Sequence, residues 1–204
     1  MNALIEKAFA VRGQISSTNE TAHPMPSHVR RALPQDAEAI AAVHVRTWQI
    51  AYRGQLPDHF LEKLTESTDR RIEFWRNEIS APPHGHEVWV AGHEMQVDGF
   101  AAIGPARDED PKTTAELYAI YVEPKHWNQG LGRALFEHST RRLAGQGYAT
   151  AILWVLESNT RARRFYEIAG WAADSGSKIE NRHDGIELRE IRYRIDLRRE
   201  NEES

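Results

Sequence analysis

The stretch HWNQGLGRALFEH (residues 126–138) is the most informative part of the sequence, because it places two glycines, Gly130 and Gly132, at the start of a helical pattern. Glycine is the poorest ordinary residue inside a helix, so these residues do not help its first turn to form. They do let main-chain N–H groups approach a ligand closely, and a helix N-terminus offers free N–H groups and a partial positive charge. The stretch therefore predicts a loop that binds a phosphate group.

Two well-known phosphate-binding motifs do not match this sequence. A dinucleotide-binding loop requires a third glycine where Leu135 stands. A nucleotide-binding P-loop requires Lys and then Ser or Thr after the last glycine, and this chain has Arg133 and Ala134 there. The second mismatch disfavours a nucleotide-dependent phosphotransferase. What remains is a strand that ends at Pro124, a short loop and an amphipathic helix over 131–144.

The rest of the chain alternates between strand and helix patterns around this loop. Strands are expected at 28–33, 87–92, 96–104, 115–124, 149–156 and 186–195, and helices at 37–50, 58–79, 131–144 and 159–170. These elements indicate a single α/β (α+β) domain over 28–197, with about six to seven strands and about four helices. The polar residues 1–27 are interpreted as an N-terminal extension, and 198–204 as a charged tail.

Two local features are also predicted. Asp36 directly precedes the first helix and is a candidate N-cap. The apolar phase of IELREIRYRI (186–195) shifts between Leu188 and Ile191. An extra residue at 189–190, forming a β-bulge, would explain that shift.

The composition excludes several classes of protein and of site. With 204 residues and 40% hydrophobic content, the chain can bury one sizeable core. A formal net charge of −4 gives no basic field for nucleic acid, and no apolar run is long enough to span a membrane. The chain has no cysteine, which excludes disulfides, thiolate metal sites and a cysteine nucleophile. These features fit a cytoplasmic location.

Two motifs, in this order, resemble those of the GNAT superfamily of acyl-CoA-dependent N-acyltransferases. The first is YVEPKHWNQGLGRAL (121–135), in which Pro124 ends a strand ahead of the two glycines. The second is NTRARRFYEIAGW (159–171), a helical segment that begins with Asn and has a Tyr seven residues later. The resemblance covers roughly residues 28–196. It implies a mixed, mostly antiparallel central sheet with a splayed central pair of parallel strands.

The resemblance also implies that acetyl-CoA is the acyl donor and that main-chain groups hold it. Its pyrophosphate is expected on the N–H groups of Gln129, Gly130, Leu131, Gly132, Arg133 and Ala134. Its pantetheine arm is expected to pair, like an added strand, with main-chain groups of Ile120, Tyr121 and Val122. Asn159 and Tyr166 are the remaining expected cofactor contacts.

One motif position departs from the family. Trp127 stands where Arg or Gln is usual. If that side chain helps to hold the pyrophosphate, main-chain N–H groups together with Lys125 or Arg133 must do so here. Weaker binding of the cofactor is one expected consequence.

The same resemblance assigns roles in the chemistry. Because the chain has no cysteine, a primary amine is expected to attack the thioester directly in a ternary complex. Glu116 is the candidate base, since an amine with a pKa of about 10 is protonated at neutral pH; an exposed strand residue is the alternative interpretation. Tyr166 is the candidate acid for the departing thiolate, and a core tyrosine is the alternative. No metal is expected.

The acceptor is expected to be a small-molecule or peptide amine that binds near the helical region 37–79. Trp48, Tyr52 and Phe60 are interpreted mostly as core residues of that region, although some could line the acceptor site. A non-catalytic acyl-CoA-binding sensor is the alternative function. Neither nucleic acid nor a membrane is expected as a partner, and a homodimer through the C-terminal strands is left open.

Overall fold

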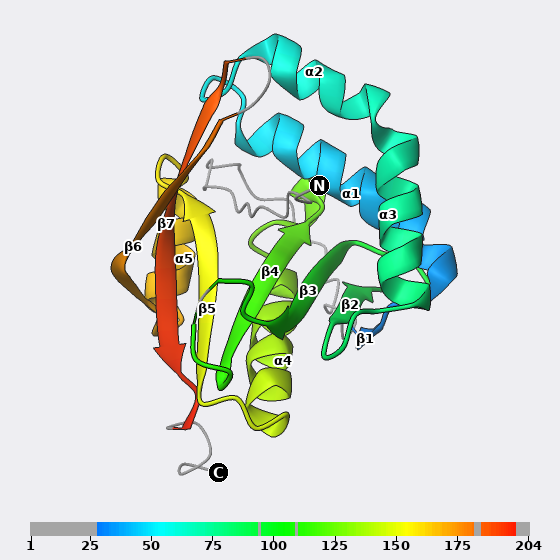
Figure 1. Ribbon diagram of the computed structural model, residues 1–204. Coiled ribbons are helices and arrows are strands. Elements are labelled where there is room, and N and C mark those ends of the chain that lie inside the picture. Colours follow the sequence, from blue (N-terminus) through cyan, green and yellow to red (C-terminus); the bar gives the residue numbers. More distant parts are fainter. Residues whose placement is uncertain (1–27, 94, 109, 182–184, 199–204) are drawn as a thin grey trace, which may run out of the picture.

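The computed structural model describes residues 28–198 apart from 94, 109 and 182–184. The expected extension (1–27) and nearly all of the expected tail (198–204) therefore lie outside the described residues. Within them, a seven-stranded sheet carries helices on both faces (Figure 1).

The described residues form seven strands, five α-helices and two short 3-10 turns. The strands are β1 (His28–Arg31), β2 (Glu87–Gly92), β3 (Gly99–Pro105), β4 (Thr114–Val122), β5 (Thr150–Leu156), β6 (Ala172–Asn181) and β7 (Glu187–Asp196). The helices are α1 (Ala37–Ala51), α2 (Asp58–Glu66), α3 (Thr68–Ser80), α4 (Leu131–Gly145) and α5 (Thr160–Ile168). The 3-10 turns are η1 (Pro34–Asp36) and η2 (Pro124–His126).

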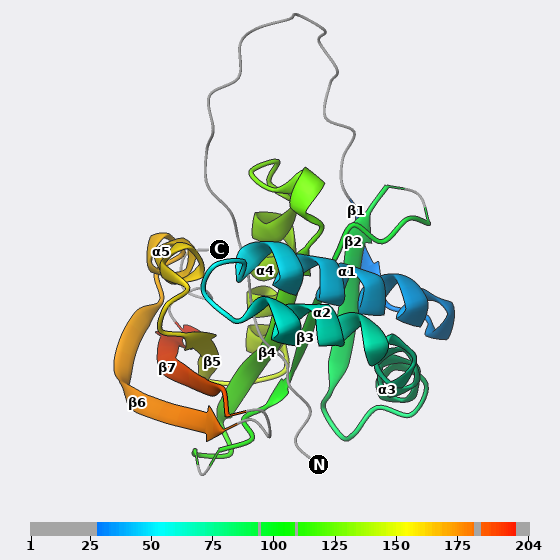
Figure 2. The ribbon, with the colours of Figure 1, turned by 90° about the horizontal axis from the view of Figure 1, so that it is seen from above.

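The strand order is β1-β2-β3-β4-β5-β7-β6, and every neighbouring pair is antiparallel except β4 and β5. This is the mixed, mostly antiparallel sheet that the resemblance implies. Helices α1, α2 and α3 pack on one face and α4 and α5 on the other (Figures 1 and 2). Central strand β4 is buried along its whole length because both of its faces are covered.

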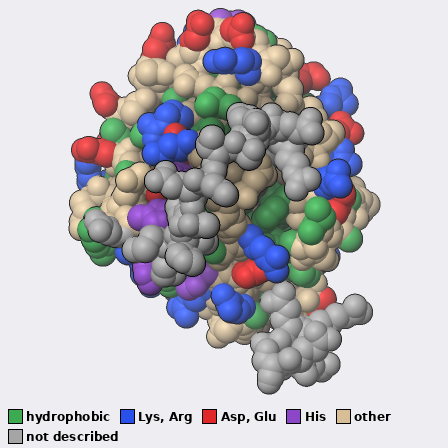
Figure 3. Space-filling model, turned by 180° about the vertical axis from the view of Figure 1, so that it is seen from behind, with side chains coloured by type: hydrophobic (Ala, Val, Ile, Leu, Met, Phe, Trp, Pro, Cys, Tyr) green, Lys and Arg blue, Asp and Glu red, His purple; other side chains and the backbone are tan. Residues whose placement is uncertain are grey.

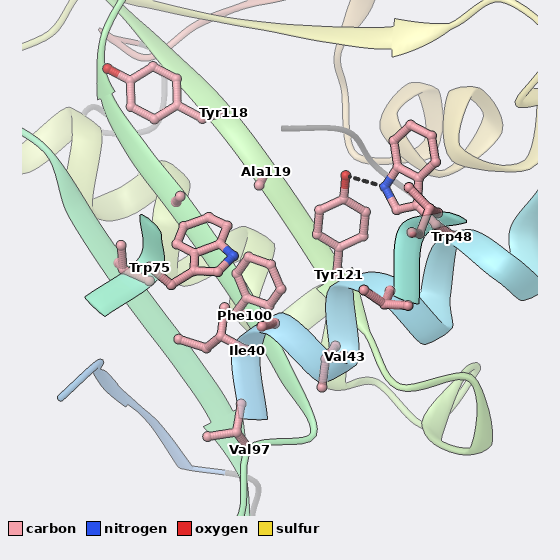
Figure 4. Packing of buried hydrophobic residues seen from close by; sticks show 14 of the residues in the cluster. Ile40, Val43, Trp48, Trp75, Val97, Phe100, Tyr118, Ala119 and Tyr121 are labelled. Carbon is pink, nitrogen blue, oxygen red and sulfur yellow. Dashed lines mark hydrogen bonds between the residues drawn. The ribbon is translucent and has the colours of Figure 1, made fainter. Parts of the chain in front are cut away.

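Two hydrophobic clusters lie on the two faces of the sheet. On the α1–α3 side, Phe100 and Tyr121 belong to an aromatic cluster, in which Trp48 Nε1 donates a hydrogen bond to the Tyr121 hydroxyl (3.0 Å; Figure 4). Trp48, Tyr52 and Phe60 are 2%, 0% and 7% exposed, so they are core residues, as expected. The second cluster fills the space between the sheet and helices α4 and α5.

The predicted helix over 58–79 is interrupted at Ser67, whose φ of −100° and ψ of 15° end α2. The Ser67 hydroxyl donates to the Leu64 carbonyl (3.2 Å), and the Thr68 hydroxyl donates to the Thr65 carbonyl (2.7 Å). Such short polar side chains offer the backbone hydrogen bonds that compete with a continuing helix. The single predicted helix is therefore two helices, which raises the total from the expected four or so to five.

The predicted bulge at 189–190 is wrong. β7 pairs with β5 in regular register, and the irregularity lies in the partner strand β6, at residues 174–176. The apolar phase of β7 shifts because the strand buries Leu188 in the α1–α3 cluster and Tyr193 in the α4–α5 cluster. These clusters lie on opposite faces, and side chains of a regular strand alternate between faces.

Asp36 stands directly before α1, but its side chain does not cap that helix. Its carboxylate accepts hydrogen bonds from the Leu33 N–H (2.7 Å) and from Arg30 Nη1 and Nη2 (2.7 and 2.9 Å). The predicted N-cap therefore closes the η1 turn instead and ties it to β1.

On the face shown in Figure 3, Lys and Arg side chains are interspersed with Asp and Glu rather than gathered by sign. This pattern fits a chain with a formal net charge of −4. It differs from the positively charged surface that would attract nucleic acid. None of the helices in the described part of the chain is long and apolar enough to cross a membrane.

Candidate active site

The two central strands separate after a short parallel ladder. β4 pairs with β5 only where residues 114–116 meet 150–152, although both strands continue beyond that point (Figure 1). On its other side β4 remains paired with β3 as far as Val122. Residues 117–122 therefore have no strand partner on the β5 side within the described structure, and we call this side the open edge of β4. The divergence confirms the splayed parallel pair that the resemblance implies.

The direction of the main-chain groups decides which of them line the open edge. The Glu123 N–H donates to the Asp98 carbonyl (2.7 Å) and so points toward β3. Because this direction alternates along a strand, the main chain of Tyr121 also faces β3. The N–H groups of Ile120 and Val122 then face β5. Of the strand residues expected to bind the pantetheine arm, Ile120 and Val122 have the suitable main-chain direction.

Trp127, the residue that departs from the family motif, is anchored at the end of this edge. Its Nε1 donates a hydrogen bond to the Val122 carbonyl (2.7 Å). The Thr47 hydroxyl of α1 donates to the same carbonyl (3.2 Å). The Val122 carbonyl is thus held from two directions, which fixes the end of β4. Beyond it lies the loop that carries Gly130 and leads into α4, which we call the glycine loop.

The glycine loop curls tightly into the N-terminus of α4. Asn128 has a φ of 61° and Gly130 a φ of 86°, both in the left-handed region. The Ala134 N–H donates the first helical bond, to the Gly130 carbonyl (2.9 Å), and no side chain from the described residues caps the helix. The N–H groups of residues 131–133 precede that bond and point out of the helix end. This arrangement is a main-chain site for an anion.

Two side chains near the loop are engaged elsewhere. Gln129 Nε2 donates to the Lys125 carbonyl (2.9 Å), which folds this side chain back onto the loop. Arg133 Nε bonds Glu137 Oε1 (2.6 Å) on the outer side of α4, and the Arg133 side chain is 79% exposed. Gln129 and Arg133 can therefore offer a ligand their main-chain N–H groups more readily than their side chains.

Asn159 fixes the start of α5. Its Oδ1 accepts the Ala162 N–H (3.0 Å), which is the hydrogen bond of an N-cap. Its Nδ2 donates to the Tyr52 hydroxyl (3.0 Å), and both residues are buried. Asn159 thereby links the helix that carries Tyr166 to the segment that follows α1.

Tyr166 is fully buried in the α4–α5 cluster, with ring centroids of Phe136 and Tyr193 at 5.9 and 6.0 Å. Its hydroxyl has no hydrogen-bond partner in the part of the chain that the structure describes. Burial raises the pKa of this hydroxyl well above its ordinary value, so the group is protonated at neutral pH. Leaving a buried hydroxyl unpaired costs about 1–3 kcal/mol of stability. This cost indicates that the Tyr166 hydroxyl is placed to bond a ligand.

Glu116 lies on β4 and is 1% exposed, so the exposed-strand interpretation is wrong. Its Oε2 accepts hydrogen bonds from the main-chain N–H and the Nε of Arg107 (3.2 and 3.1 Å). Arg107 Cζ also lies 4.7 Å from the ring centroid of Tyr118. Glu116 is therefore a buried carboxylate held by an arginine.

Comparison with known proteins identifies the family. A sequence profile of the acetyltransferase (GNAT) family matches residues 47–171, which is more than half of the chain. The uncharacterized N-acetyltransferase YuaI of Bacillus subtilis (strain 168) is 36% identical over 132 residues, covering 64% of this chain and 72% of that protein. The probable N-acetyltransferase Rv2775 of Mycobacterium tuberculosis is 26% identical over 175 residues, covering 84% and 95%. The chain belongs to the GNAT family and is an acyl-CoA-dependent N-acetyltransferase.

Solved structures share the fold. The PaiA N-acetyltransferase of Thermoplasma acidophilum, crystallised in complex with coenzyme A, matches with a TM-score of 0.65 at 19% identity, over 84% of this chain and 99% of that one. YncA of Salmonella typhimurium, solved with its cofactor acetyl-CoA, matches with a TM-score of 0.62 at 21% identity, over 84% and 94%.

The groups at this site fit the acetyl-CoA that the family implies. The uncapped N-terminus of α4 suits a diphosphate, and the open edge of β4 suits the amide groups of a pantetheine arm. The unpartnered Tyr166 hydroxyl lies in the same cluster as Ile120 and Val122, which have N–H groups on that edge. Among the described residues there is no group of three or more His, Asp or Glu side chains that could hold a metal ion.

Proposed function

We propose that this enzyme transfers an acetyl group from acetyl-CoA to a primary amine by direct attack within a ternary complex. The observation that carries the proposal is the divergence of β4 from β5 next to the N-terminus of α4, with the Tyr166 hydroxyl in the adjoining core; among the described residues that helix end has no side-chain cap and that hydroxyl has no partner. The absence of cysteine from the chain supports direct transfer, since no thiol can carry the acetyl group.

Each group at the site has a distinct part in this proposal. Acetyl-CoA, when bound, supplies an activated thioester carbonyl. The Val122 N–H donates a hydrogen bond to the oxygen of that carbonyl and stabilises the negative charge that develops there. As the new C–N bond forms and the C–S bond breaks, the Tyr166 hydroxyl donates its proton to the sulfur, and the second proton that the nitrogen loses on becoming an amide restores the hydroxyl. A module that only bound acyl-CoA would need no such acid, so the buried hydroxyl favours catalysis.

Glu116 is the proposed base. Arg107 holds its carboxylate in place by several hydrogen bonds. The same bonds compete for its lone pairs, so transfer from the substrate ammonium through a water molecule suits this geometry better than direct contact. The proton then passes to solvent.

The acceptor is proposed to be an amine on a small molecule or at a peptide N-terminus. The [ribosomal protein bS18]-alanine N-acetyltransferase of Escherichia coli (strain K12) is 46% identical over 57 residues, covering 28% of this chain and 38% of that protein. This short match supports a peptide amine as one class to test. The cytoplasmic location and the homodimer stay predictions.

The proposed function can be tested by following thiol release from acetyl-CoA over a panel of small amines, amino acids and peptides with free N-termini. Saturable release with at least one amine, and initial-rate lines that intersect, would support direct transfer in a ternary complex. Binding of acetyl-CoA without turnover of any amine would favour the sensor alternative instead.

A further inference from the structure

We propose that Arg161, held against the ring of Trp127, supplies the side-chain cation that binds the diphosphate of acetyl-CoA in this protein. The pair would replace the Arg or Gln side chain that the family motif carries at position 127. This inference rests on the proposed function, because it concerns how the same acyl donor is held.

The contact joins the two segments that follow the diverging strands β4 and β5. Arg161 is in the first turn of α5, after β5, and Trp127 is in the loop between β4 and α4. Arg161 Cζ lies 4.8 Å from the centroid of the Trp127 ring, a cation–π distance. The indole is itself fixed by its hydrogen bond to the Val122 carbonyl (2.7 Å). Arg161 is thus positioned at the end of the sheet where the glycine loop begins.

Arg161 is a half-buried cation that has no ion-pair partner among the residues that the structure describes. Within the described ranges, its guanidinium makes no hydrogen bond and no ion pair, and burial lowers its pKa to about 10. On the same helix, Arg163 bonds the Tyr193 hydroxyl (3.3 Å) and the Glu157 carbonyl (3.1 Å). Partly buried guanidinium groups are expected to have an acceptor, so Arg161 is positioned to bind an anion that the described residues do not provide.

The neighbouring groups indicate that this anion is a diphosphate. The free N–H groups at the start of α4 can bind one side of a diphosphate. A guanidinium offers planar, forked N–H donors that match phosphate oxygens in pairs. The Arg or Gln side chain that the motif usually has at position 127 is absent. Trp127 stands there instead, and the Arg161 guanidinium packs against its ring. Arg133, which the sequence suggests for this task, is bonded to Glu137 and largely exposed.

The test measures binding by calorimetry, with CoA and with dephospho-CoA, which keeps the diphosphate and lacks the 3′-phosphate. Arg161→Ala should weaken the binding of both ligands by about 10- to 100-fold, the range for hydrogen bonds to charged groups. Arg164→Ala is the matched control, an exposed arginine on the same helix, and should bind both ligands like the wild type. A loss confined to CoA would overturn the assignment in favour of the 3′-phosphate.

A second variant tests the substitution itself. Adding Trp127→Arg to Arg161→Ala restores the motif side chain and should recover part of the lost affinity. No recovery would overturn the claim that the pair replaces that side chain. If the wild type binds CoA and Arg161→Ala binds it equally well, this inference is wrong while the proposed function stands. If the wild type binds neither ligand, the proposed function fails as well.

Discussion

The hydroxyl of Tyr166 adds a polar atom where phenylalanine would fill nearly the same space. Because that atom is buried and has no partner in the described part of the chain, Tyr166→Phe should leave the melting temperature unchanged or raise it. The same variant should lose about 10²–10⁴-fold in kcat, the range for a removed general acid, with little change in the Kd for acetyl-CoA. Steady-state kinetics, calorimetry and thermal melts measure these three effects. Undiminished turnover would reduce Tyr166 to a core residue.

Glu116 differs from Tyr166, because both oxygens of its carboxylate already accept hydrogen bonds from Arg107. If it is the base, Glu116→Gln should slow turnover at neutral pH and move the pH–rate profile toward alkaline pH, since more of the amine must then arrive already deprotonated. Glu190→Gln is the matched control, because Glu190 is also buried and is paired with Lys178 (3.0 Å). An unchanged profile in Glu116→Gln, with a lowered melting temperature, would assign the pair a structural role.

Some of the candidate site residues could be identified from the sequence and others could not. Gly130, Asn159 and Tyr166 stand in local patterns of a glycine loop and an N-capped helix, which the sequence displays directly. Arg161 could not be singled out, because its signal is a contact with Trp127, which is distant in sequence, and the lack of an ion-pair partner among the described residues. Only the departure at Trp127 indicated that a charge must come from elsewhere.

At the scale of elements, the junction of the glycine loop with α4 depends on backbone conformation. A Cβ at Gly130 would meet no atom within 4 Å, so Gly130→Ala adds only the strain of an L residue at a φ of 86°. That strain is about 1–2 kcal/mol and should open the loop, so that the variant binds acetyl-CoA more weakly. Gly145→Ala, at the other end of α4 and also in open space, should leave binding unchanged. Equal affinities in the two variants would contradict a binding role for the loop.

The elements that sequence patterns predicted well are those whose apolar residues match the faces that the fold buries. α1, α4 and β4 agree with expectation because each has its apolar residues on faces that the fold covers. β6 was not expected, because AADSGSKIEN is a mostly exposed edge strand without alternating apolar residues. Its pairing depends on contacts distant in sequence, such as Asp174 with Arg192 (2.9 Å) and Arg194 (3.3 Å). Local patterns cannot report such contacts.

Across the whole molecule, carboxylates held by arginines tie segments together, some of them neighbouring and some distant in sequence. In Asp36, burial alone would raise the pKa, but hydrogen bonds from Arg30 and the Leu33 N–H outweigh it and lower the pKa below its ordinary value. In Glu87, hydrogen bonds from Arg142 are the largest cause of a lowered pKa. At pH values above the carboxyl pKa of the unfolded chain, about 4, both ionised groups stabilise the fold. This stabilisation is lost as the pH falls through the lower pKa values that the two groups have in the folded state.

His44 should make the free energy of unfolding decrease at a higher pH than the one at which the carboxylates titrate. Its ring is buried, stacks on Tyr121 at 4.7 Å between centroids, and has its pKa lowered to about 3 by burial and by the nearby charge of Arg71. In the unfolded chain a histidine takes up a proton near pH ~6.5, whereas His44 in the fold remains neutral until about pH 3. Between these values the unfolded state binds more protons than the native state, so stability falls as the pH falls.

His44→Leu should remove that loss, because leucine is apolar, titrates in neither state and leaves no buried nitrogen unpaired. Urea unfolding at a series of pH values should show the wild type losing up to about 1.4 kcal/mol per pH unit from this group below about pH 6.5, and the variant a flatter curve until carboxylates titrate. His59→Gln, at an exposed position on α2, should keep the wild-type slope. If His44→Leu keeps that slope as well, acid lability in this range must come from other groups, and the aromatic cluster over β4 is not its origin.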